Sequence, residues 1–484
     1  CIMLGGLIMA IGQLLLFTSA SVFGENLSLA TTIMYSGLGA IILGNGFFKP
    51  NISSMVGSLY PKQEKNKLDT AFTIFYMGIN IGAFLGQSIC PLLGDVKDAG
   101  GIRDIHAFKW GFLAASIAML LGTILFYFLK NKYVVTPEGK PLGGLPSKNE
   151  SSDYEEGEAQ KAVFTPTALA LAVASFVGLF LLFHFSVDGD NVVKTIIYPI
   201  IYASGITLAG LILSDSSLTK IERDRILVIY IVSFFIIFFW AAFEQAGSSL
   251  TFIADNQTDR TFMFGWQMPA SMVQIFNGLF VVILAVPFSM LWDRLRAKEK
   301  EPISPFKLAL GLFLITVSFF MIANQVKGLG TSGLLAVKWL ILLYFLNTCA
   351  ELCLSPIGLS LVGKLSPKRF ASLLYGVFFL SNASGYALGG TLGSILPATG
   401  DKFDKAKALG IDLQPILDKK ITPTAEQLKL LADNQISDHN PIFAGFEIHN
   451  LFEFFMVFVV LTGIASVILF ALTPFLKKMM HGIR

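Results

Sequence analysis

The stretch ILVIYIVSFFIIFFWAAFEQAG, residues 226–247, carries a single charged side chain, that of Glu244. A run of about 20 apolar residues is long enough to cross the hydrocarbon core of a bilayer as a helix. Comparable runs occur throughout the chain on both sides of this stretch. The twelve predicted spans are 2–20, 29–48, 70–93, 109–129, 164–186, 195–213, 226–247, 267–292, 308–325, 334–363, 370–396 and 450–475. The sequence therefore predicts an all-α polytopic membrane protein.

The composition agrees with a lipid environment and narrows the functional classes. Of the 484 residues, 54% are hydrophobic and 14% are charged, whereas about a quarter of the residues of an average soluble domain are charged. The net charge of +3 gives no reason to expect a nucleic-acid partner. The runs also lack the alternation over about ten residues that marks the strands of a transmembrane β-barrel.

The cysteines and histidines give no sign of a metal site. Cys1, Cys90, Cys349 and Cys353 each lie in an apolar run without a CxxC pair, and the five histidines are scattered. The spans also contain no HExxH, GxSxG or paired-Asp motif. We therefore expect no metal, no cofactor and no catalytic residues, and favour a transporter over an intramembrane enzyme.

The basic residues predict which side of the membrane each loop faces. If alternate loops share a side, one set holds most of the 36 Lys and Arg residues, and such loops are usually cytoplasmic. That set includes the Gly-, Pro- and Ser-rich segment 131–163, which is typical of a flexible linker, and the C-terminus. Residues 401–445 would form a small excursion on the outer side. We expect a multi-pass protein of the cell (inner) membrane.

Glu351 and Lys49 are two of three ionisable residues that lie within apolar runs or at their edge, where a charge costs about 2.5 to 3.5 kcal/mol. Glu351 lies near the middle of 334–363, and Pro356 behind it is able to interrupt the helical hydrogen bonds. It is either a substrate or proton site or a packing carboxyl kept protonated by burial. Lys49 precedes Pro50, which disfavours a continued regular helix. Its ammonium either faces a substrate path or extends to the cytoplasmic headgroups.

Three further residues leave the same choice between function and structure open. Glu244 lies towards the outer end of its span, where it is either a functional carboxyl or an interfacial helix cap. Asn80 and Asn277 lie inside apolar runs, where a polar group needs a hydrogen-bond partner. That partner is either a neighbouring helix or a ligand.

Several motifs resemble those of one transporter family. The run FTIFYMGINIGAF, residues 72–84, resembles the long signature of the proton-dependent oligopeptide transporter (POT/PTR) family, a branch of the major facilitator superfamily. The remaining matches occur in the family's order and are GNGFFKPN (44–51), FWAAFEQAGSSL around Trp240, AELCLSPIGLSLVGKLSP (350–367) and LSNASGYALGG (380–390). Together they extend over nearly the whole chain.

The resemblance implies the major facilitator fold, with two helical bundles and, in bacterial members, two inserted helices between them. The predicted domains are then 1–130 for family helices three to six, the cytoplasmic linker 131–163, the inserted pair 164–224, and 225–484 for helices seven to twelve, including the excursion 401–445. The first two family helices, which carry an ExxER motif, would precede Cys1. We therefore expect a chain that lacks these two helices and does not transport alone.

The resemblance also implies roles for individual residues. Lys49 would attract the peptide carboxylate or pair with Glu351, and Glu351 would meet the peptide's amino end. Asn80 and Asn277 would help to bind the amino end, and Tyr76 would line the same cavity. Trp240 and Phe378 would belong to the side-chain pocket. Glu244 would take part in proton coupling together with Glu351.

The function implied is a proton-coupled symporter that imports di- and tripeptides by alternating access, with protons as the coupling ion. We expect a monomer in the lipid bilayer. The alternative is a transporter of the same fold for nitrate, another small anion or a non-peptide solute. Glu351 opposite Lys49 favours a ligand that carries an amine.

Overall fold

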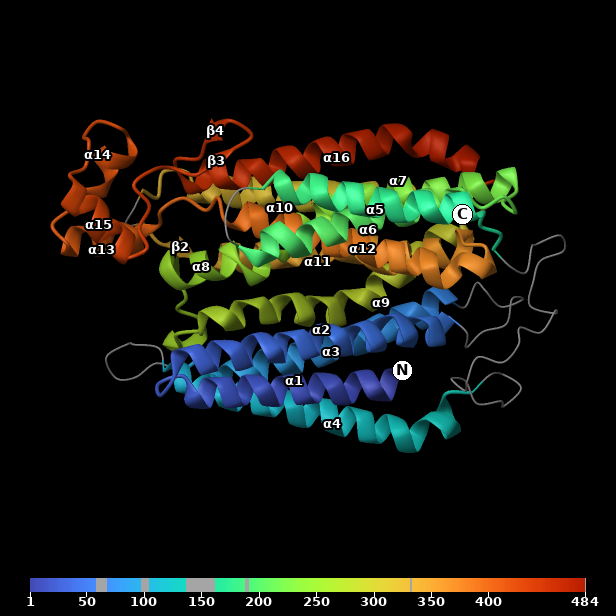
Figure 1. The fold of residues 1–484 in the computed structure, drawn as a ribbon, viewed down its shortest axis with the longest axis horizontal. Coiled ribbons are helices and arrows are strands. Elements are labelled where there is room, and N and C mark those ends of the chain that lie inside the picture. Colours follow the sequence, from blue (N-terminus) through green and yellow to red (C-terminus); the bar gives the residue numbers. More distant parts are fainter. Residues whose placement is uncertain (58–67, 97–103, 136–161, 188–190, 331–332, 484) are drawn as a thin grey trace.

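A computed structural model describes residues 1–57, 68–96, 104–135, 162–187, 191–330 and 333–483. The long helices lie side by side along one common axis (Figure 1). Eleven helices of the described residues are long and apolar enough to cross a membrane. A further helix, α12 (Ala371–Gly393), covers most of the predicted span 370–396 and contains several Gly and Ser residues. Each of the twelve predicted spans therefore coincides with a helix.

The first four long helices form one bundle. They are α1 (Ile2–Val22), α2 (Leu27–Gly57), α3 (Leu68–Gly94) and α4 (Phe108–Tyr133), the last preceded by a 3-10 turn, η2 (Ile105–Ala107). Glycines bring α1 and α2 into close contact, because a Cβ atom on Gly5 would lie 2.6 Å from the carbonyl oxygen of Gly44. Small residues commonly allow such backbone approach between membrane helices.

The second bundle contains the main hydrophobic core. Its long helices are α7 (Lys220–Phe243), α9 (Ile275–Ala297), α10 (Ser304–Val326), α11 (Val337–Leu365), α12 and α16 (Leu451–Met479). Large side chains such as Phe239, Phe319 and Phe454 are fully buried between them. The phenyl rings of Phe319 and Phe458 stack with centroids 4.9 Å apart.

Short elements connect α7 to α9 at one end of this bundle. They are the 3-10 turn η5 (Glu244–Gly247), α8 (Ser249–Asn256), β1 (Thr258–Asp259), η6 (Met263–Gly265) and η7 (Ala270–Gln274). Strand β1 pairs in parallel with β2 (Leu335–Ala336), which directly precedes α11. This pairing holds the connection against the start of α11.

Two positions at which the sequence suggests an interrupted helix are helical in the structure. Helix α2 continues through residue 50 to Gly57, so the predicted interruption after Lys49 is wrong. Helix α11 likewise continues past Pro356 to Leu365. Membrane helices tolerate such prolines, because neighbouring helices and local adjustments satisfy the freed backbone groups.

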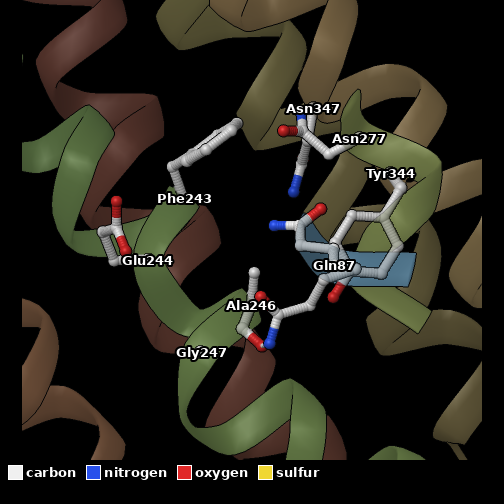
Figure 2. A pocket seen from close by; sticks show the side chains of 9 residues that line it. Gln87, Phe243, Glu244, Ala246, Gly247, Asn277, Tyr344 and Asn347 are labelled. Atoms are coloured by element: carbon white, nitrogen blue, oxygen red, sulfur yellow. Dashed lines mark hydrogen bonds between the residues drawn. The ribbon is translucent and has the colours of Figure 1, made fainter. Parts of the chain in front are cut away.

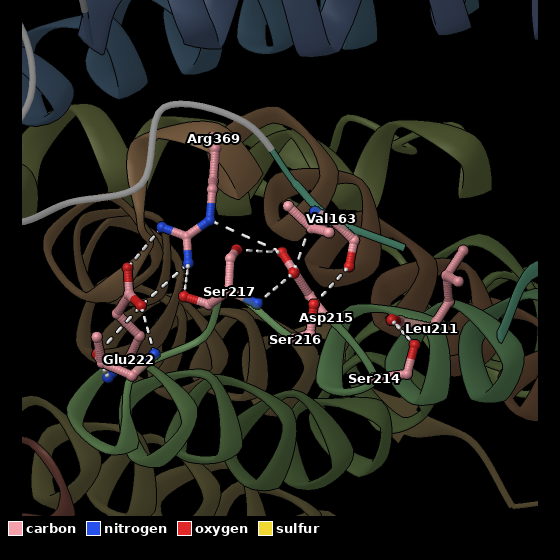
Figure 3. A network of polar contacts seen from close by, with 9 residues as sticks. Val163, Leu211, Ser214, Asp215, Ser216, Ser217, Glu222 and Arg369 are labelled. Atoms are coloured by element: carbon pink, nitrogen blue, oxygen red, sulfur yellow. Dashed lines mark hydrogen bonds and ion pairs between the residues drawn. The ribbon is translucent and has the colours of Figure 1, made fainter. Parts of the chain in front are cut away.

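The inserted pair consists of α5 (Pro166–Phe185) and α6 (Tyr198–Leu213), with a π-helical turn, η4 (Val193–Ile197), leading into α6. Helix α6 packs on α12 of the second bundle. A buried polar network holds the chain after α6 to the starts of α7 and α12 (Figure 3). Arg369 donates to the Glu222 carboxylate at 2.6 and 3.0 Å and lies 3.8 Å from Asp215 Oδ2.

The segment predicted as an excursion forms a small unit of its own. It contains α13 (Gly400–Ala408), α14 (Leu413–Leu417), α15 (Ala425–Asp433) and the antiparallel pair of β3 (Ile442–Phe443) with β4 (Phe446–Glu447). Ile411, Leu413 and Leu431 belong to a separate buried cluster. Helices α13 to α15 lie at the end of the molecule opposite to both chain termini (Figure 1).

Candidate functional site

The two bundles meet along α3, α9 and α11 (Figure 1). Helices α3 and α9 approach closely at Gly278, where an added Cβ atom would lie 3.2 Å from the backbone nitrogen of Phe84. Near the excursion end of this contact, the hydroxyl of Ser271 donates a hydrogen bond to the carboxylate of Asp95. Several of the predicted site residues lie on these three helices, at the boundary between the bundles.

Glu351 is the centre of a hydrogen-bonded cluster between the bundles. Its side chain is buried, with 5% of the residue exposed. One carboxylate oxygen accepts from Asn277 Nδ2 of α9 at 3.0 Å, and the other accepts from the hydroxyl of Tyr76 on α3. Asn277 Nδ2 also lies 3.1 Å from Thr348 Oγ1 on α11. The cluster therefore joins three helices and both bundles.

Asn80 supports this cluster from α3. It is buried, with 6% exposed, and its Nδ2 donates to the backbone carbonyl of Tyr76 at 2.9 Å. Asn80 thus lies one turn from Tyr76 on the same helix and contacts its backbone. Of the residues predicted around Glu351, the structure brings Tyr76 and Asn277 into direct contact with the carboxylate.

A cavity of about 150 Å³ lies next to this cluster, with Glu244 in its wall. Figure 2 shows Gln87 of α3 and Tyr344 of α11 on one side, with Phe243 of α7 and Glu244 of η5 on the other. Glu244 is half-buried at the first position of η5. The lining residues are Gln87, Phe243, Glu244, Ala246, Gly247, Gln274, Asn277, Tyr344 and Asn347. Asn277 belongs to both the cavity wall and the Glu351 cluster.

Lys49 faces the second bundle from α2. Its Nζ lies 5.6 Å from the centroid of the Phe379 ring on α12, within the range of a cation–π contact. The acidic side chain that attracts it is that of Glu244. In the part of the chain that the structure describes, Lys49 makes no salt bridge within 4.0 Å to Glu244 or Glu351. The predicted pairing of Lys49 with Glu351 is thus not formed in this conformation.

Comparison with known protein families identifies the family of this chain. A model described as the POT family matches residues 1–144 and 186–407. The chain belongs to the POT family. This confirms the family predicted from the motifs around Tyr76 and Glu351.

Relatives of known sequence and structure extend this assignment. The peptide transporter YePEPT of Yersinia enterocolitica is 31% identical over 84% of this chain and 75% of its own length. The di-/tripeptide transporter of Lactococcus lactis subsp. lactis is 30% identical over 80% of this chain and 72% of its own length. A POT family transporter crystallised with 5-aminolevulinic acid superposes with a TM-score of 0.65 at 26% identity, over 98% of this chain and 81% of that one. The predicted major facilitator fold is therefore confirmed.

The two predicted aromatic residues lie differently in this POT-family chain. Trp240 packs edge to face with Phe243 and with Tyr386 of α12, with centroids 5.4 and 5.8 Å apart. Phe378 is buried at 3% exposure, and its ring fills the space beside Gly358 of α11. The predicted side-chain pocket around Trp240 and Phe378 stays a prediction for both residues.

Four polar lining residues of the cavity were absent from the sequence-based prediction. Gln87 lies in the run 70–93, and Tyr344 and Asn347 lie in 334–363, where polar groups could have been found by the reasoning applied to Asn80. Gln274 lies in 267–292 and is held by hydrogen bonds to Ala246 O and Thr251 Oγ1 at 2.9 and 3.1 Å. Their convergence on one cavity depends on the packing of the two bundles.

Proposed function

We propose that the protein is a proton-coupled symporter that imports di- and tripeptides by alternating access. Membership of the POT family and the names of relatives such as the Lactococcus di-/tripeptide transporter support this function. The observation that carries it is the contact of Glu351 with side chains of α3 and α9 at the bundle boundary. A carboxylate that joins both bundles is placed to respond when a charged substrate binds between them.

Glu351 would bind the amino end of the peptide. An ionised carboxylate offers about four acceptor sites, and Tyr76 and Asn277 occupy some of them. A peptide ammonium brings three donors and a full positive charge, so its hydrogen bonds to Glu351 would be stronger than those of neutral groups. Binding would compete with Tyr76 and weaken one of the contacts that hold the bundles together.

Lys49 would bind the carboxylate end. Its ammonium is directed towards α12 and the second bundle, where the face of Phe379 contributes only a weak cation–π attraction. The attraction of Glu244 acts on it without a direct salt bridge between the two. A peptide carboxylate would therefore find an ammonium oriented across the boundary. Lys49 and Glu351 would thus hold the two charged ends of one zwitterion.

Protons would supply the driving force, because each positive charge that enters gains about 2.3 kcal/mol per 100 mV of membrane potential. Glu244 and Glu351 are the carboxyl groups that would carry them. Both lie at the bundle boundary, so movement of the bundles would change their partners and their hydration. The affinity of a carboxyl for a proton depends on both of these factors.

We propose an orientation in the cell (inner) membrane with the linker 131–163 and the C-terminus in the cytoplasm. Basic residues occupy the last turns of the helices that end opposite the excursion, namely Lys130 and Lys132 of α4, Arg294 and Arg296 of α9, Lys364 of α11, and Lys477 and Lys478 of α16. Basic residues near helix ends favour the cytoplasmic side. We further propose that a monomer is the functional unit.

The test is uptake of labelled Ala-Ala into proteoliposomes by the protein expressed from its complete gene, with an inward proton gradient. Unlabelled dipeptides and tripeptides should compete, whereas free amino acids and nitrate should not. Lys49→Gln should abolish uptake while the variant keeps the melting temperature of the wild type. Competition by nitrate but not by peptides would support the small-anion alternative and reject this function.

A further inference from the structure

The cavity beside Glu351 contains more carboxamide groups than the two charged ends of a peptide require. Of its lining residues, Gln274 and Asn277 are held by hydrogen bonds within the protein. Their amide groups donate to a backbone carbonyl, two hydroxyls and the Glu351 carboxylate. These two side chains therefore have defined orientations that build the wall of the cavity.

The other two carboxamides are not held in this way. Asn347 is 1% exposed, and its Oδ1 is buried without a hydrogen-bond partner among the residues that the structure describes. Gln87 Oε1 is likewise buried without a hydrogen-bond partner in the described part of the chain. An acceptor left unpaired in this way costs free energy, so two side chains from different bundles that line one cavity would gain from an added hydrogen-bonding group.

The position of these two residues relates them to the amino-end site. Asn347 precedes Glu351 by one turn of α11, which places it about 6 Å along the helix axis, towards the excursion end of the molecule (Figure 1). Gln87 belongs to α3 of the other bundle and lines the same cavity as Asn347, with Phe243 and Glu244 on the opposite side in Figure 2. A substrate whose ammonium contacts Glu351 would therefore have its first side chain within reach of both.

We propose that Gln87 and Asn347 form a specificity subsite for a neutral amide on the first side chain of the substrate, that of Gln or Asn. This inference rests on the proposed peptide transport. A carboxamide offers one donor group and one acceptor, so it pairs with a substrate amide in either orientation. The subsite takes its ligand from both bundles, as the Glu351 cluster does.

The size of the cavity fits one side chain. A cavity of about 150 Å³ holds a molecule the size of benzene, whereas pockets for whole small ligands span about 300–1,000 Å³. The side chain of glutamine is small enough to fit a cavity of about 150 Å³. The rest of the peptide would lie outside this cavity, between Glu351 and Lys49.

The experiment compares Gln-Ala with Met-Ala, whose first side chains have similar length and shape, as competitors of labelled Ala-Ala uptake. With the wild-type protein, Gln-Ala should inhibit at about tenfold lower concentration, the effect of two amide hydrogen bonds at about 0.7 kcal/mol each. Asn347→Leu should abolish this ratio, and Gln87→Leu should reduce it several-fold. The matched control is Asn324→Leu on α10, where the amide donates to the carbonyl of Phe320 in its own helix at 2.8 Å. That variant should keep the wild-type ratio.

Each result has one meaning. Equal inhibition by Gln-Ala and Met-Ala in the wild type, or an unchanged ratio in Asn347→Leu, would overturn the subsite while leaving peptide transport intact. Stronger inhibition by Lys-Ala than by Gln-Ala in the wild type would replace the amide subsite with a cation subsite. Absence of Ala-Ala uptake by the wild type would instead reject the proposed function. If Asn347→Leu fails to fold, Gln87→Leu provides the same test, because Gln87 is only half-buried.

Discussion

Tyr76 is the residue through which the first bundle contacts Glu351. Its hydroxyl donates to the carboxylate, while Asn277 donates to the other oxygen from the second bundle. The two contacts are not equivalent, because only the one with Tyr76 must break when α3 moves relative to α11. A substrate ammonium at Glu351 would favour that break by supplying a charged donor in place of a neutral one.

Glu244 differs from Glu351 in being half-buried at the start of η5, in the wall of the cavity. We predict that Glu244→Gln keeps the exchange of labelled for unlabelled dipeptide but loses uphill accumulation, because the amide has the shape of the acid and cannot bind the coupling proton. Accumulation under a proton gradient should fall by about tenfold or more, a change of about 1.4 kcal/mol. Both activities are measured in the same proteoliposomes.

Glu426→Gln in the first turn of α15 is the matched control, because Glu426 is exposed in the excursion and far from the cavity along the chain. It should leave both exchange and accumulation at the wild-type level. Unaltered accumulation in Glu244→Gln would remove this residue from the coupling path.

A polar side chain within an apolar run can be recognised from sequence, although its role stays a prediction. Glu351 and Asn277 stand out in this way, and the structure places them 3.0 Å apart. The direction of Lys49 could not be obtained from sequence, because a lysine near a helix end reaches several environments. The burial of Phe378 against Gly358 likewise depends on how closely α11 and α12 approach.

At the scale of elements, the buried guanidinium of Arg369 helps to hold the inserted pair α5 and α6 on the second bundle. Asp215 follows α6, Glu222 begins α7 as part of a capping box with Thr219, and Arg369 precedes α12. Asp215 also accepts from the backbone nitrogen of Val163, before α5, at 3.1 Å (Figure 3). The network therefore fixes both ends of the pair to the second bundle, although the sequence shows these charges only as loop residues.

We predict that Arg369→Met destabilises the protein by about 3–5 kcal/mol, the usual cost of removing one partner from a buried charge pair. The side chains of Arg369 and Asp215 are 2% and 0% exposed, so the carboxylates would stay buried without the guanidinium. The melting temperature in detergent should fall clearly, and Asp215→Asn in the same chain should restore part of it.

Arg223→Met on α7 serves as the control, because Arg223 is exposed at the same end of the bundle. Substitutions at exposed positions usually change stability by no more than about 0.5 kcal/mol. Equal melting temperatures for Arg369→Met and Arg223→Met would show that the network does not hold the inserted pair in place.

The helices themselves were largely predictable from sequence, because long apolar runs have few other ways to satisfy their backbone in lipid. Within the predicted excursion, helix α15 begins with a capping box formed by Thr424 and Gln427. The prediction at Pro50 was wrong, because a proline rule taken from soluble helices was applied to a helix that neighbouring helices support. The connection from α7 to α9 was also missed, since its short elements lie partly within predicted spans.

At the scale of the whole molecule, the contact of α3 with α9 defines how the two bundles are held in this conformation. Gly278 allows the backbones to approach, and Ser271 with Asp95 adds a hydrogen bond nearer the excursion end. Alternating access requires this contact to open and close. A side chain that prevents close approach should therefore shift the balance between conformations without touching the charged residues of the site.

We predict that Gly278→Val opens this contact. The new side chain would meet the backbone of Phe84 at 3.2 Å, and such overpacking costs about 1–3 kcal/mol. A penalty of this size in one conformation alone changes the balance between conformations by about 5–150-fold. Spin labels at Leu27 and Leu334, both exposed at the excursion ends of opposite bundles, should report a longer distance in the variant, and Ala-Ala uptake should fall. Gly178→Val on α5, where an added Cβ atom meets nothing within 4 Å, should change neither. An unchanged label distance in Gly278→Val together with normal uptake would mean that the contact of α3 with α9 is not part of the moving boundary.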